Sequence, residues 1–190
     1  MSMAASRPAC EPPLLVVVMG VSGCGKTSVG ARLAARLRLP FIEGDSLHPA
    51  ANIEKMAAGI PLQDEDRWPW LARIGAAISA AAAEGQGLVI ACSALKRAYR
   101  DRLNAAAGGR LFFVFLYGGR ALLRERMRAR TGHFMPAALL DSQLATLEDP
   151  RGEAHVVAVD IAMTVEEIVA AALKELERSG AVLPQEPGTH

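Results

Sequence analysis

The residues best suited to chemistry lie in the segment GVSGCGKT, from Gly20 to Thr27, which fits the pattern G-x-x-x-x-G-K-[ST]. Glycines let such a loop curl until its backbone N–H groups point inward at phosphate oxygens. Lys26 brings a positive charge to the β- and γ-phosphates, and Thr27 offers a hydroxyl to Mg²⁺. The alternative is a glycine-rich turn without a ligand. The motif predicts a loop that binds ATP and Mg²⁺ and in which Lys26 is also catalytic; its residues are Gly20, Val21, Ser22, Gly23, Cys24, Gly25, Lys26, Thr27 and Ser28.

A second group of polar residues follows the apolar run 40–42, in the segment IEGDSLHP. Asp45 could accept the proton of an attacking hydroxyl, or it could hold Mg²⁺ through a water molecule. The alternative is that Asp45 or Ser46 caps a helix over residues 50–59. His48 could contact a ligand or simply form part of the turn. We predict Asp45 as a catalytic, substrate-binding and metal-binding residue, and His48 as a substrate-binding residue.

A carboxylate that many P-loop NTPases use is missing from its usual place. In those proteins a central strand ends in an aspartate that helps to hold Mg²⁺. Here the third apolar run ends VIACSALK, with Ala91, Cys92 and Ser93 in that position, and no Asn-Lys-x-Asp guanine signature is present. These absences disfavour a switch GTPase or a motor-type ATPase, and they leave Asp45 as the nearest replacement.

The segment RALLRERMRAR is rich in arginine and runs into TGHFMP, whose glycine and proline could form the hinge of a lid. An arginine delivered by a closing lid would stabilise the charge on a phosphoryl group in transfer. The alternative is a solvated basic face on an amphipathic helix, which is the expectation for Arg120. We predict a lid over about residues 124–136, in which Arg124 and Arg130 bind the nucleotide and Arg130 is also catalytic.

Two basic residues follow the third apolar run, in the segment CSALKRAYR. Lys96 and Arg100 stand four residues apart near the start of an expected helix, which Ser93 could cap. A carboxylate on a substrate would suit a helix N-terminus with a cation nearby. The alternative is two exposed basic residues with no ligand. We predict Lys96 and Arg100 as substrate-binding residues.

The segment PLQDEDRWPW holds three acidic residues and two tryptophans. We expect Asp66 to cap the helix that begins here. We expect Trp68 and Trp70 to pack on the core of the domain, because large aromatic side chains contribute most when they are buried. A contact between this segment and a substrate is the alternative.

An α/β fold would bring these residues together. Five apolar runs, at residues 14–19, 40–43, 87–91, 110–116 and 155–160, are mostly continuous rather than alternating, as strands covered on both faces should be. Helical patterns lie between them, and strands that alternate with helices favour right-handed crossovers and a parallel sheet. We therefore predict a three-layer sandwich with a five-stranded parallel sheet. Ligands then belong at the carboxyl ends of its strands.

Length and charge limit the other possibilities. The 190 residues suit one domain, which we predict at 14–180 between a flexible N-terminal leader (1–13) and a flexible C-terminal tail (181–190). The net charge of +1 gives no long-range attraction to nucleic acid or to an anionic membrane, so neither is an expected partner. The three cysteines are odd in number and lack metal-ligand spacing, which indicates a reducing compartment and predicts the cytoplasm.

Four blocks of the chain resemble the gluconokinases: GVSGCGKT, GDSLHPAANIEKMAAGIPLQDEDRWPWL, ACSALKRAYRDRL and GHFMPAALLDSQLATLEDP. The resemblance runs from about Leu14 to about Leu176. It implies a fold similar to shikimate and adenylate kinases, with a helical substrate-binding region and a lid, and it implies transfer of phosphate from ATP to D-gluconate. His133, as a substrate-binding residue, and Gln143 are candidates by this resemblance alone. Cys24 departs from the serine that many members carry.

Two other functions and the oligomeric state stay open at this point. A nucleotide kinase of similar fold would need arginines for an acceptor phosphate beside the second strand, and residues 45–59 contain none. A non-catalytic nucleotide sensor would tolerate the loss of Asp45, whereas a kinase would not. A monomer and a homodimer are both compatible with the sequence.

Overall fold

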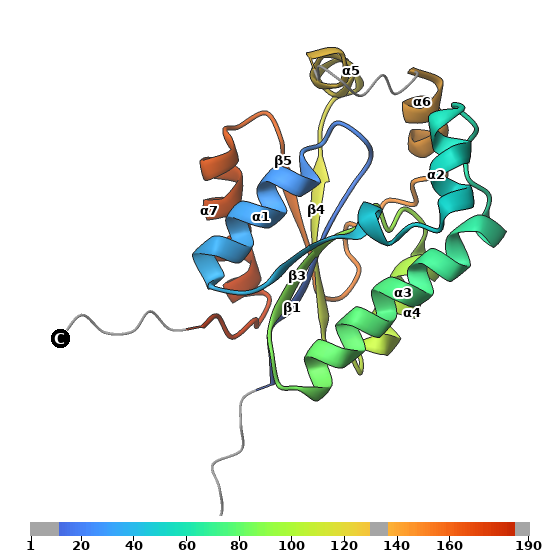
Figure 1. The fold of residues 1–190 in the computed structure, drawn as a ribbon. Helices are drawn as coiled ribbons and strands as arrows, with labels where there is room; N and C mark the ends of the chain where they lie inside the picture. The colour runs from blue at the N-terminus through green and yellow to red at the C-terminus, as the bar shows by residue number, and fades with distance from the viewer. Residues whose placement is uncertain (1–11, 130–136, 185–190) are drawn as a thin grey trace, which may run out of the picture.

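The computed structural model describes residues 12–129 and 137–184, which form a five-stranded parallel sheet between two layers of helices (Figure 1). The predicted fold class is confirmed, and each predicted run lies within one residue of an observed strand. The strands lie in the order β2-β3-β1-β4-β5. They are β1 (Leu15–Met19), β2 (Phe41–Glu43), β3 (Leu88–Ala91), β4 (Leu111–Tyr117) and β5 (Val156–Asp160).

Both faces of the sheet are covered, which explains why the strands are apolar throughout. On β1, Val16 and Val18 point into one buried cluster while Leu15 and Val17 point into another. The first cluster is closed by α1 (Lys26–Leu37) and α7 (Val165–Arg178), and the second by α3 (Asp64–Ala83) and α4 (Arg97–Ala106). Parallel strands with this double cover are typical of doubly wound α/β domains.

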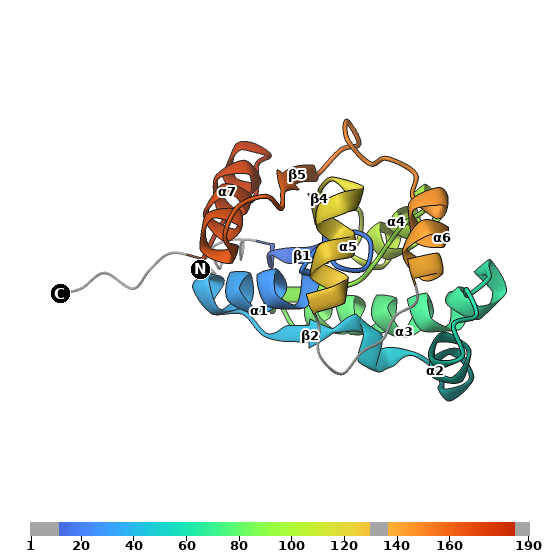
Figure 2. The same cartoon turned by 90° about the horizontal axis from the view of Figure 1, so that it is seen from above.

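The remaining helices gather where the strands end. They are the short 3₁₀-helix η1 (Gly44–Leu47), α2 (Ala50–Ala57), α5 (Arg120–Ala129) and α6 (Ala137–Thr146). In the view from above, α5 lies over the middle of the sheet, with α6 and α2 to one side (Figure 2). This end of the sheet is where ligands were expected, so the additional helices surround the predicted site.

Close contacts fix the turn after β2. A Cβ atom on Gly44 would lie 2.1 Å from the carbonyl oxygen of Ala91, so only glycine lets η1 approach β3 this closely. The indole nitrogen of the buried Trp70 donates a hydrogen bond of 2.7 Å to the Gly44 carbonyl. The core packing expected of Trp70 is confirmed, and the same packing positions Asp45.

The predicted helix caps are partly corrected. The N-cap of α2 is Pro49, so neither Asp45 nor Ser46 caps that helix; both belong to η1. Ser93 does not cap α4, because that helix begins at Arg97 and its N-cap is Lys96. The expectation for Asp66 holds in modified form: Gln63 is the N-cap of α3, and the Asp66 carboxylate accepts from its backbone N–H.

The packed region reaches slightly past residue 180, since Ala181 is buried and Leu183 packs on the cluster beneath α1 and α7. Of the predicted leader and tail, most residues lie outside the described ranges. Within those ranges, no helix combines the length and the apolar character that crossing a membrane requires.

Candidate active site

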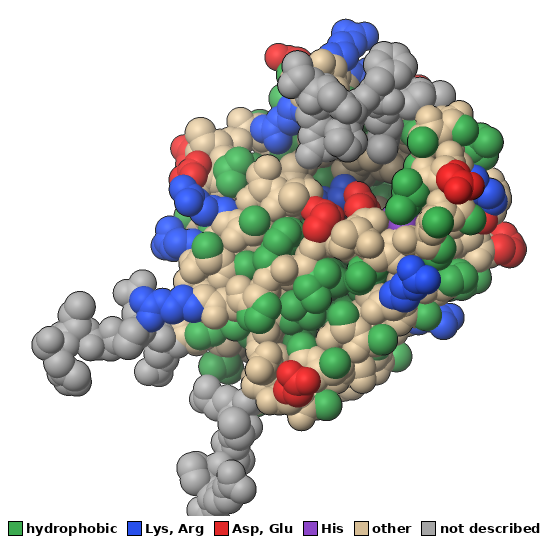
Figure 3. All heavy atoms as spheres, in the orientation of Figure 1, with side chains coloured by type: hydrophobic (Ala, Val, Ile, Leu, Met, Phe, Trp, Pro, Cys, Tyr) green, Lys and Arg blue, Asp and Glu red, His purple; other side chains and the backbone are tan. Residues whose placement is uncertain are grey.

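Several of the predicted residues line a cavity at the carboxyl end of the sheet, where the surface is hollowed (Figure 3). Its walls come from the loop after β1, from η1, from α3 and from α6. The polar side chains that line it are Ser22, Lys26, Asp45, His48, Arg67, Ser93, Ser142 and Gln143. The structure thus brings two separately predicted groups, the glycine-rich loop and the turn after β2, to one cavity.

The glycine-rich loop has the strand-loop-helix setting that its motif requires. It follows β1 directly, and Gly20, Gly23 and Gly25 all have positive φ angles that favour glycine. Among the residues placed in the structure, no side chain caps the N-terminus of α1, so the first amides of that helix have no side-chain partner there. The Lys26 ammonium donates to the Val21 carbonyl at 3.1 Å, within the same loop. A phosphate would meet both a cation and open N–H donors here.

His48 and Asp45 form a pair beside this loop. His48 is buried and stacks on Trp70, with ring centroids 4.2 Å apart and the planes 12° from parallel. The Asn52 side-chain nitrogen lies 3.2 Å from His48 Nδ1, and because an amide nitrogen can only donate, Nδ1 must accept. The neutral ring therefore carries its proton on Nε2, which lies 3.9 Å from Asp45 Oδ1. That separation is too long for a direct hydrogen bond and leaves both groups available to a hydroxyl between them.

Burial lowers the pKa of His48, and the positive charge of Arg67 acts in the same direction, while Asp45 opposes it. The unfolded chain, in which His48 has its ordinary pKa near 6.5, therefore binds this proton more readily than the folded protein. The stability that neutral His48 contributes is fully present above that pKa and is lost as the pH falls below it.

We expect the melting temperature of the wild-type protein to fall more between about pH 7.5 and about pH 5.5 than that of His48→Gln, because glutamine does not titrate. Thermal melts of both proteins across this interval measure the difference in slope. The variant will have a lower melting temperature at every pH through lost stacking, so only the slopes are compared. Parallel curves would contradict the assignment of a buried, neutral His48.

Arg67 also lines this cavity, although no role was predicted for it. The residue projects from α3 and is 8% exposed. Its Nε and Nη2 atoms lie 3.4 and 3.3 Å from a single acceptor, the Leu62 carbonyl. Among the residues that the structure describes, no carboxylate lies within 4.0 Å of its guanidinium. The sequence does show an arginine inside the segment EDRWPW. The acidic and aromatic residues around it were interpreted as a helix cap and as core residues, and the arginine itself was not interpreted.

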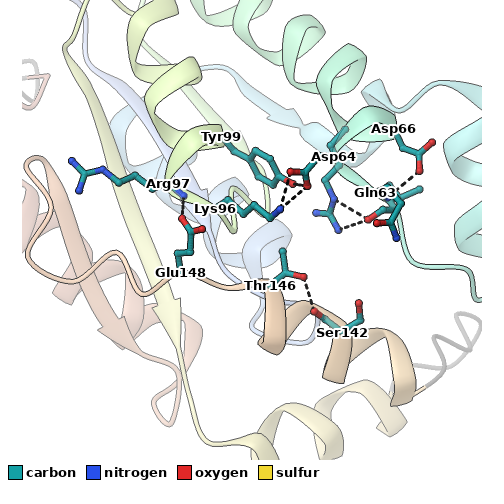
Figure 4. A network of polar contacts seen from close by, with 11 residues as sticks. Gln63, Asp64, Asp66, Lys96, Arg97, Tyr99, Ser142, Thr146 and Glu148 are labelled. Carbon is teal, nitrogen blue, oxygen red and sulfur yellow. Dashed lines mark hydrogen bonds and ion pairs between the residues drawn. The ribbon is translucent and has the colours of Figure 1, made fainter.

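Neither basic residue predicted after β3 lines this cavity. Lys96 donates to both oxygens of Asp64, at 2.7 and 2.8 Å, and the Tyr99 hydroxyl donates to the same carboxylate (Figure 4). These bonds hold the pKa of Asp64 below its usual range. Arg100 is 1% exposed and donates to Glu153 and to the carbonyls of Ala94 and Leu95.

The prediction for Arg100 is thereby corrected: its guanidinium is fully engaged inside the domain, where it fixes the loop that follows β3. Lys96 neutralises Asp64 and remains only near the cavity. Helix position alone suggested a substrate contact for both, but each cation pairs with a partly exposed acid, Lys96 with Asp64 and Arg100 with Glu153.

A second cavity, of about 310 Å³, lies on the other side of the glycine-rich loop. Its lining residues are Gly23, Cys24, Gly25, Ser28, Val29, Arg126, Met163, Thr164, Val165 and Ile168. Arg126 from α5 enters it and donates to the Ile161 carbonyl at 2.6 Å. The space adjoins the phosphate loop between α1 and the segment before α7, so it can take the remainder of a nucleotide whose phosphates lie on the loop.

The arginine-rich helix contributes differently from the prediction. Arg124 pairs with Asp141 on α6 at 3.1 Å, and Arg120 pairs with the same carboxylate at 2.6 Å. Arg124 therefore joins α5 to α6 in this structure, and Arg126 is the arginine that faces the second cavity. The other two residues predicted in the lid, Arg130 and His133, lie outside the described residues.

Two further contacts bear on the loop. The side-chain oxygen of Gln143, on α6, accepts a hydrogen bond of 2.7 Å from the backbone N–H of Ser22. Cys24 is fully buried, and burial raises the pKa of its thiol; burial likewise raises the pKa of Cys92 to about 12. Both thiols are free and protonated at neutral pH, so neither acts as a nucleophile.

Comparison with known proteins places this geometry among kinases. The family model described as AAA domain matches residues 15–150. The gluconokinase of Gluconobacter oxydans (strain 621H) is 50% identical over 147 residues, which cover 77% of this chain and 82% of that protein. The probable gluconokinase of Xenopus tropicalis is 41% identical over 179 residues, which cover 87% of this chain and 94% of that protein.

Solved structures agree with this result. A crystal structure of a gluconokinase from Sinorhizobium meliloti 1021 has a TM-score of 0.81 and 58% sequence identity, covering 87% of this chain and 93% of that one. The APS kinase CysC of Mycobacterium tuberculosis, in complex with AMPPNP and APS, has a TM-score of 0.64 at 18% identity, covering 87% of this chain and 98% of that one. The second likeness shows the shared fold alone.

Proposed function

Because the chain belongs to the gluconokinase family and carries the AAA domain of the matching model, we propose that it transfers the γ-phosphoryl group of ATP to D-gluconate, giving ADP and 6-phospho-D-gluconate. The observation that carries this proposal is that Lys26 of the phosphate loop and Asp45 of the turn after β2 line one cavity. A phosphoryl donor and a hydroxyl acceptor can meet there.

The residues of this cavity have separate roles in the proposed reaction. Lys26 and the open N–H groups of the loop hold the phosphates and stabilise the charge that spreads over the transferred group. A hydroxyl oxygen of the acceptor attacks the γ-phosphorus, the bond to the leaving oxygen of ADP breaks, and Asp45 takes the hydroxyl proton. The Nε2–H of His48 faces the same carboxylate and can donate to the acceptor oxygen, which keeps it in line for attack.

The residues at this site fit Mg²⁺. Thr27 supplies a hydroxyl at the start of α1, and Asp45 supplies a carboxylate. Glu43 at the end of β2 adds a second carboxylate, whose buried Oε2 has no hydrogen-bond partner within the described part of the chain. No cluster of three or more potential ligands occurs in that part, which suits an ion held by one or two carboxylates together with nucleotide phosphates. When bound, Mg²⁺ neutralises charge on the phosphates.

The predicted lid, at about residues 124–136, begins within α5; its residues from 130 onward lie outside the described ranges, and α6 follows it along the chain. Helix α5 rests on the phosphate loop, since a Cβ atom on Gly23 would lie 2.9 Å from both the Leu123 carbonyl and Met127. Helix α6 reaches the loop through Gln143. Nucleotide bound at the loop would therefore touch the base of both helices, and Arg130 and His133 stand in the predicted lid between them.

We expect ATP analogue and gluconate together to slow amide hydrogen exchange across α5 and α6, because lid closure excludes water and removes local opening. Exchange followed by mass spectrometry, with and without both ligands, measures this protection. Peptides from α4 serve as the control, because that helix contributes no residue to the lining of either cavity. If amide hydrogen exchange in α5 and α6 is the same with and without ligands, the prediction of a lid is wrong.

The function itself is tested by coupled ADP release over a panel of sugar acids, neutral sugars and nucleoside monophosphates. The proposal requires D-gluconate to give the highest kcat/KM and its product to carry phosphate on O6. A preference for nucleoside monophosphates would instead support a nucleotide kinase, which is disfavoured because Arg67 is the single arginine among the described residues that line the acceptor cavity. The cytoplasmic location and a homodimer remain predictions, as does the absence of nucleic acid and membrane partners.

A further inference from the structure

We propose that Arg67 binds the carboxylate of the acceptor and thereby selects the hydroxyl that is phosphorylated, an inference that rests on the proposed gluconokinase function. This proposal rests on one observation: Arg67 is buried, lines the acceptor cavity and has no acidic partner among the described residues. Buried charges in folded proteins are normally paired or serve a ligand, because an unpaired charge away from water is costly.

Arg100 provides an internal comparison for this reasoning. Both arginines are buried, but the guanidinium of Arg100 makes two bonds to Glu153, at 2.8 and 2.5 Å, and two more to backbone carbonyls. Within the described ranges, Arg67 makes only two long hydrogen bonds, both to one carbonyl, and its guanidinium also lies 5.8 Å from the centre of the Tyr99 ring. Arg100 is therefore satisfied as a structural ion pair, whereas Arg67 keeps donors for a bidentate carboxylate.

The charges around the cavity favour one orientation of a sugar acid. Asp45 lines the same cavity as Arg67, and its negative charge would repel a carboxylate placed beside it. The phosphates of ATP would add to that repulsion. A carboxylate at Arg67 leaves the far end of the acceptor chain to reach Asp45 and Lys26, so the terminal hydroxyl receives the phosphoryl group.

The test compares D-gluconate with D-glucitol, which has the same carbon chain and hydroxyls but a CH₂OH group in place of the carboxylate. In Arg67→Met, we expect affinity for gluconate, measured by calorimetry in the presence of ADP, to fall about 10- to 100-fold, the usual range for a charge-assisted hydrogen bond pair. The kcat/KM for gluconate should fall by a similar factor. The much weaker binding of glucitol and the affinity for ATP should stay within about threefold of wild type, since neither uses this cation.

Arg73→Met is the matched control, because Arg73 lies on the same helix and donates to the carbonyl of Leu47, the last residue of η1, from an exposed position. It should bind gluconate as the wild type does. Arg67→Lys keeps the positive charge but loses the planar guanidinium that can bind a carboxylate with two parallel hydrogen bonds. It should therefore bind gluconate with intermediate affinity. Melting curves accompany each variant, and if Arg67→Met does not fold, Arg67→Lys decides the question through its gluconate affinity relative to its ATP affinity.

Two results would overturn the inference while leaving the proposed function intact. The first is wild-type gluconate affinity in Arg67→Met, or in Arg67→Lys if that is the folded variant. The second is an equal loss for gluconate, glucitol and ATP, which would show a structural role. Failure of the wild-type protein to phosphorylate gluconate at all would instead overturn the proposed function, so the two failures are distinguishable.

Discussion

Replacing Lys26 with alanine is expected to lower kcat by about 1,000-fold, the upper end of the effect of removing one preorganised donor from a transition state. The ammonium lies at the phosphate loop, on the wall of the acceptor cavity, and donates only to the Val21 carbonyl in the described structure. Its charge is needed most when negative charge spreads over the γ-phosphoryl group, so kcat should fall more than ATP affinity. Single-turnover phosphoryl transfer to gluconate measures the chemical step directly.

Lys174→Ala is the matched control for this experiment, because Lys174 is exposed on α7 and away from both cavities. It should keep wild-type activity. Lys26→Ala should keep the wild-type melting temperature within a few degrees, since its side chain makes one hydrogen bond and no ion pair among the described residues. Turnover above about a tenth of the wild-type rate in Lys26→Ala would contradict the assigned role.

The second large effect is expected at Asp45. Asp45→Asn keeps the shape of the side chain and much of its hydrogen-bonding reach, but it removes the negative charge and the basicity. We expect kcat to fall by about 100-fold or more, the scale of general acid–base contributions. ATP affinity should change much less, because the phosphate loop is untouched. Steady-state kinetics with gluconate, together with ATP titrations, separate the two quantities.

Asp160→Asn is the matched control, because Asp160 also ends a parallel strand but lies at the opposite edge of the sheet, where it accepts from the Ala162 N–H. A melting curve for each variant shows whether lost activity reflects lost folding. If Asp45→Asn turns gluconate over at nearly the wild-type rate, Asp45 is not the base. Glu43→Gln then becomes the next variant, since Glu43 ends β2 and carries a buried oxygen without a partner.

The sheet and the phosphate loop could be predicted from the sequence alone, because short continuous segments of the chain determine both. A continuous apolar run such as LLVVVM indicates that both faces of β1 are buried. The loop motif indicates a backbone conformation that glycine permits. Asp45 could also be placed, since it follows a strand and parallel strands present their carboxyl ends at one edge. Its alternative as a helix cap failed on a local detail, the 3₁₀ turn that separates it from α2.

The arginines could not be sorted in the same way, because their roles depend on partners far along the chain. Arg100 is neutralised by Glu153, which is 53 residues away, and Lys96 by Asp64, which is 32 residues away. No periodicity reports such pairs. Arg67 was missed for the opposite reason: the role proposed for it depends on its having no acidic partner among the described residues, which only the packed structure reveals.

The hydrogen bond from Ser22 to Gln143 has a thermodynamic consequence for nucleotide affinity. One N–H cannot serve the side chain of α6 and a phosphate oxygen equally well, so the two acceptors compete for it. The apparent dissociation constant for ATP is then the intrinsic dissociation constant divided by the fraction of molecules in which Gln143 no longer accepts the Ser22 hydrogen bond. Two kinases with identical phosphate loops can therefore differ in apparent ATP affinity through a residue that lies 121 positions from the loop. Any change that weakens the hydrogen bond between Ser22 and Gln143 raises that fraction and strengthens nucleotide binding without touching the nucleotide.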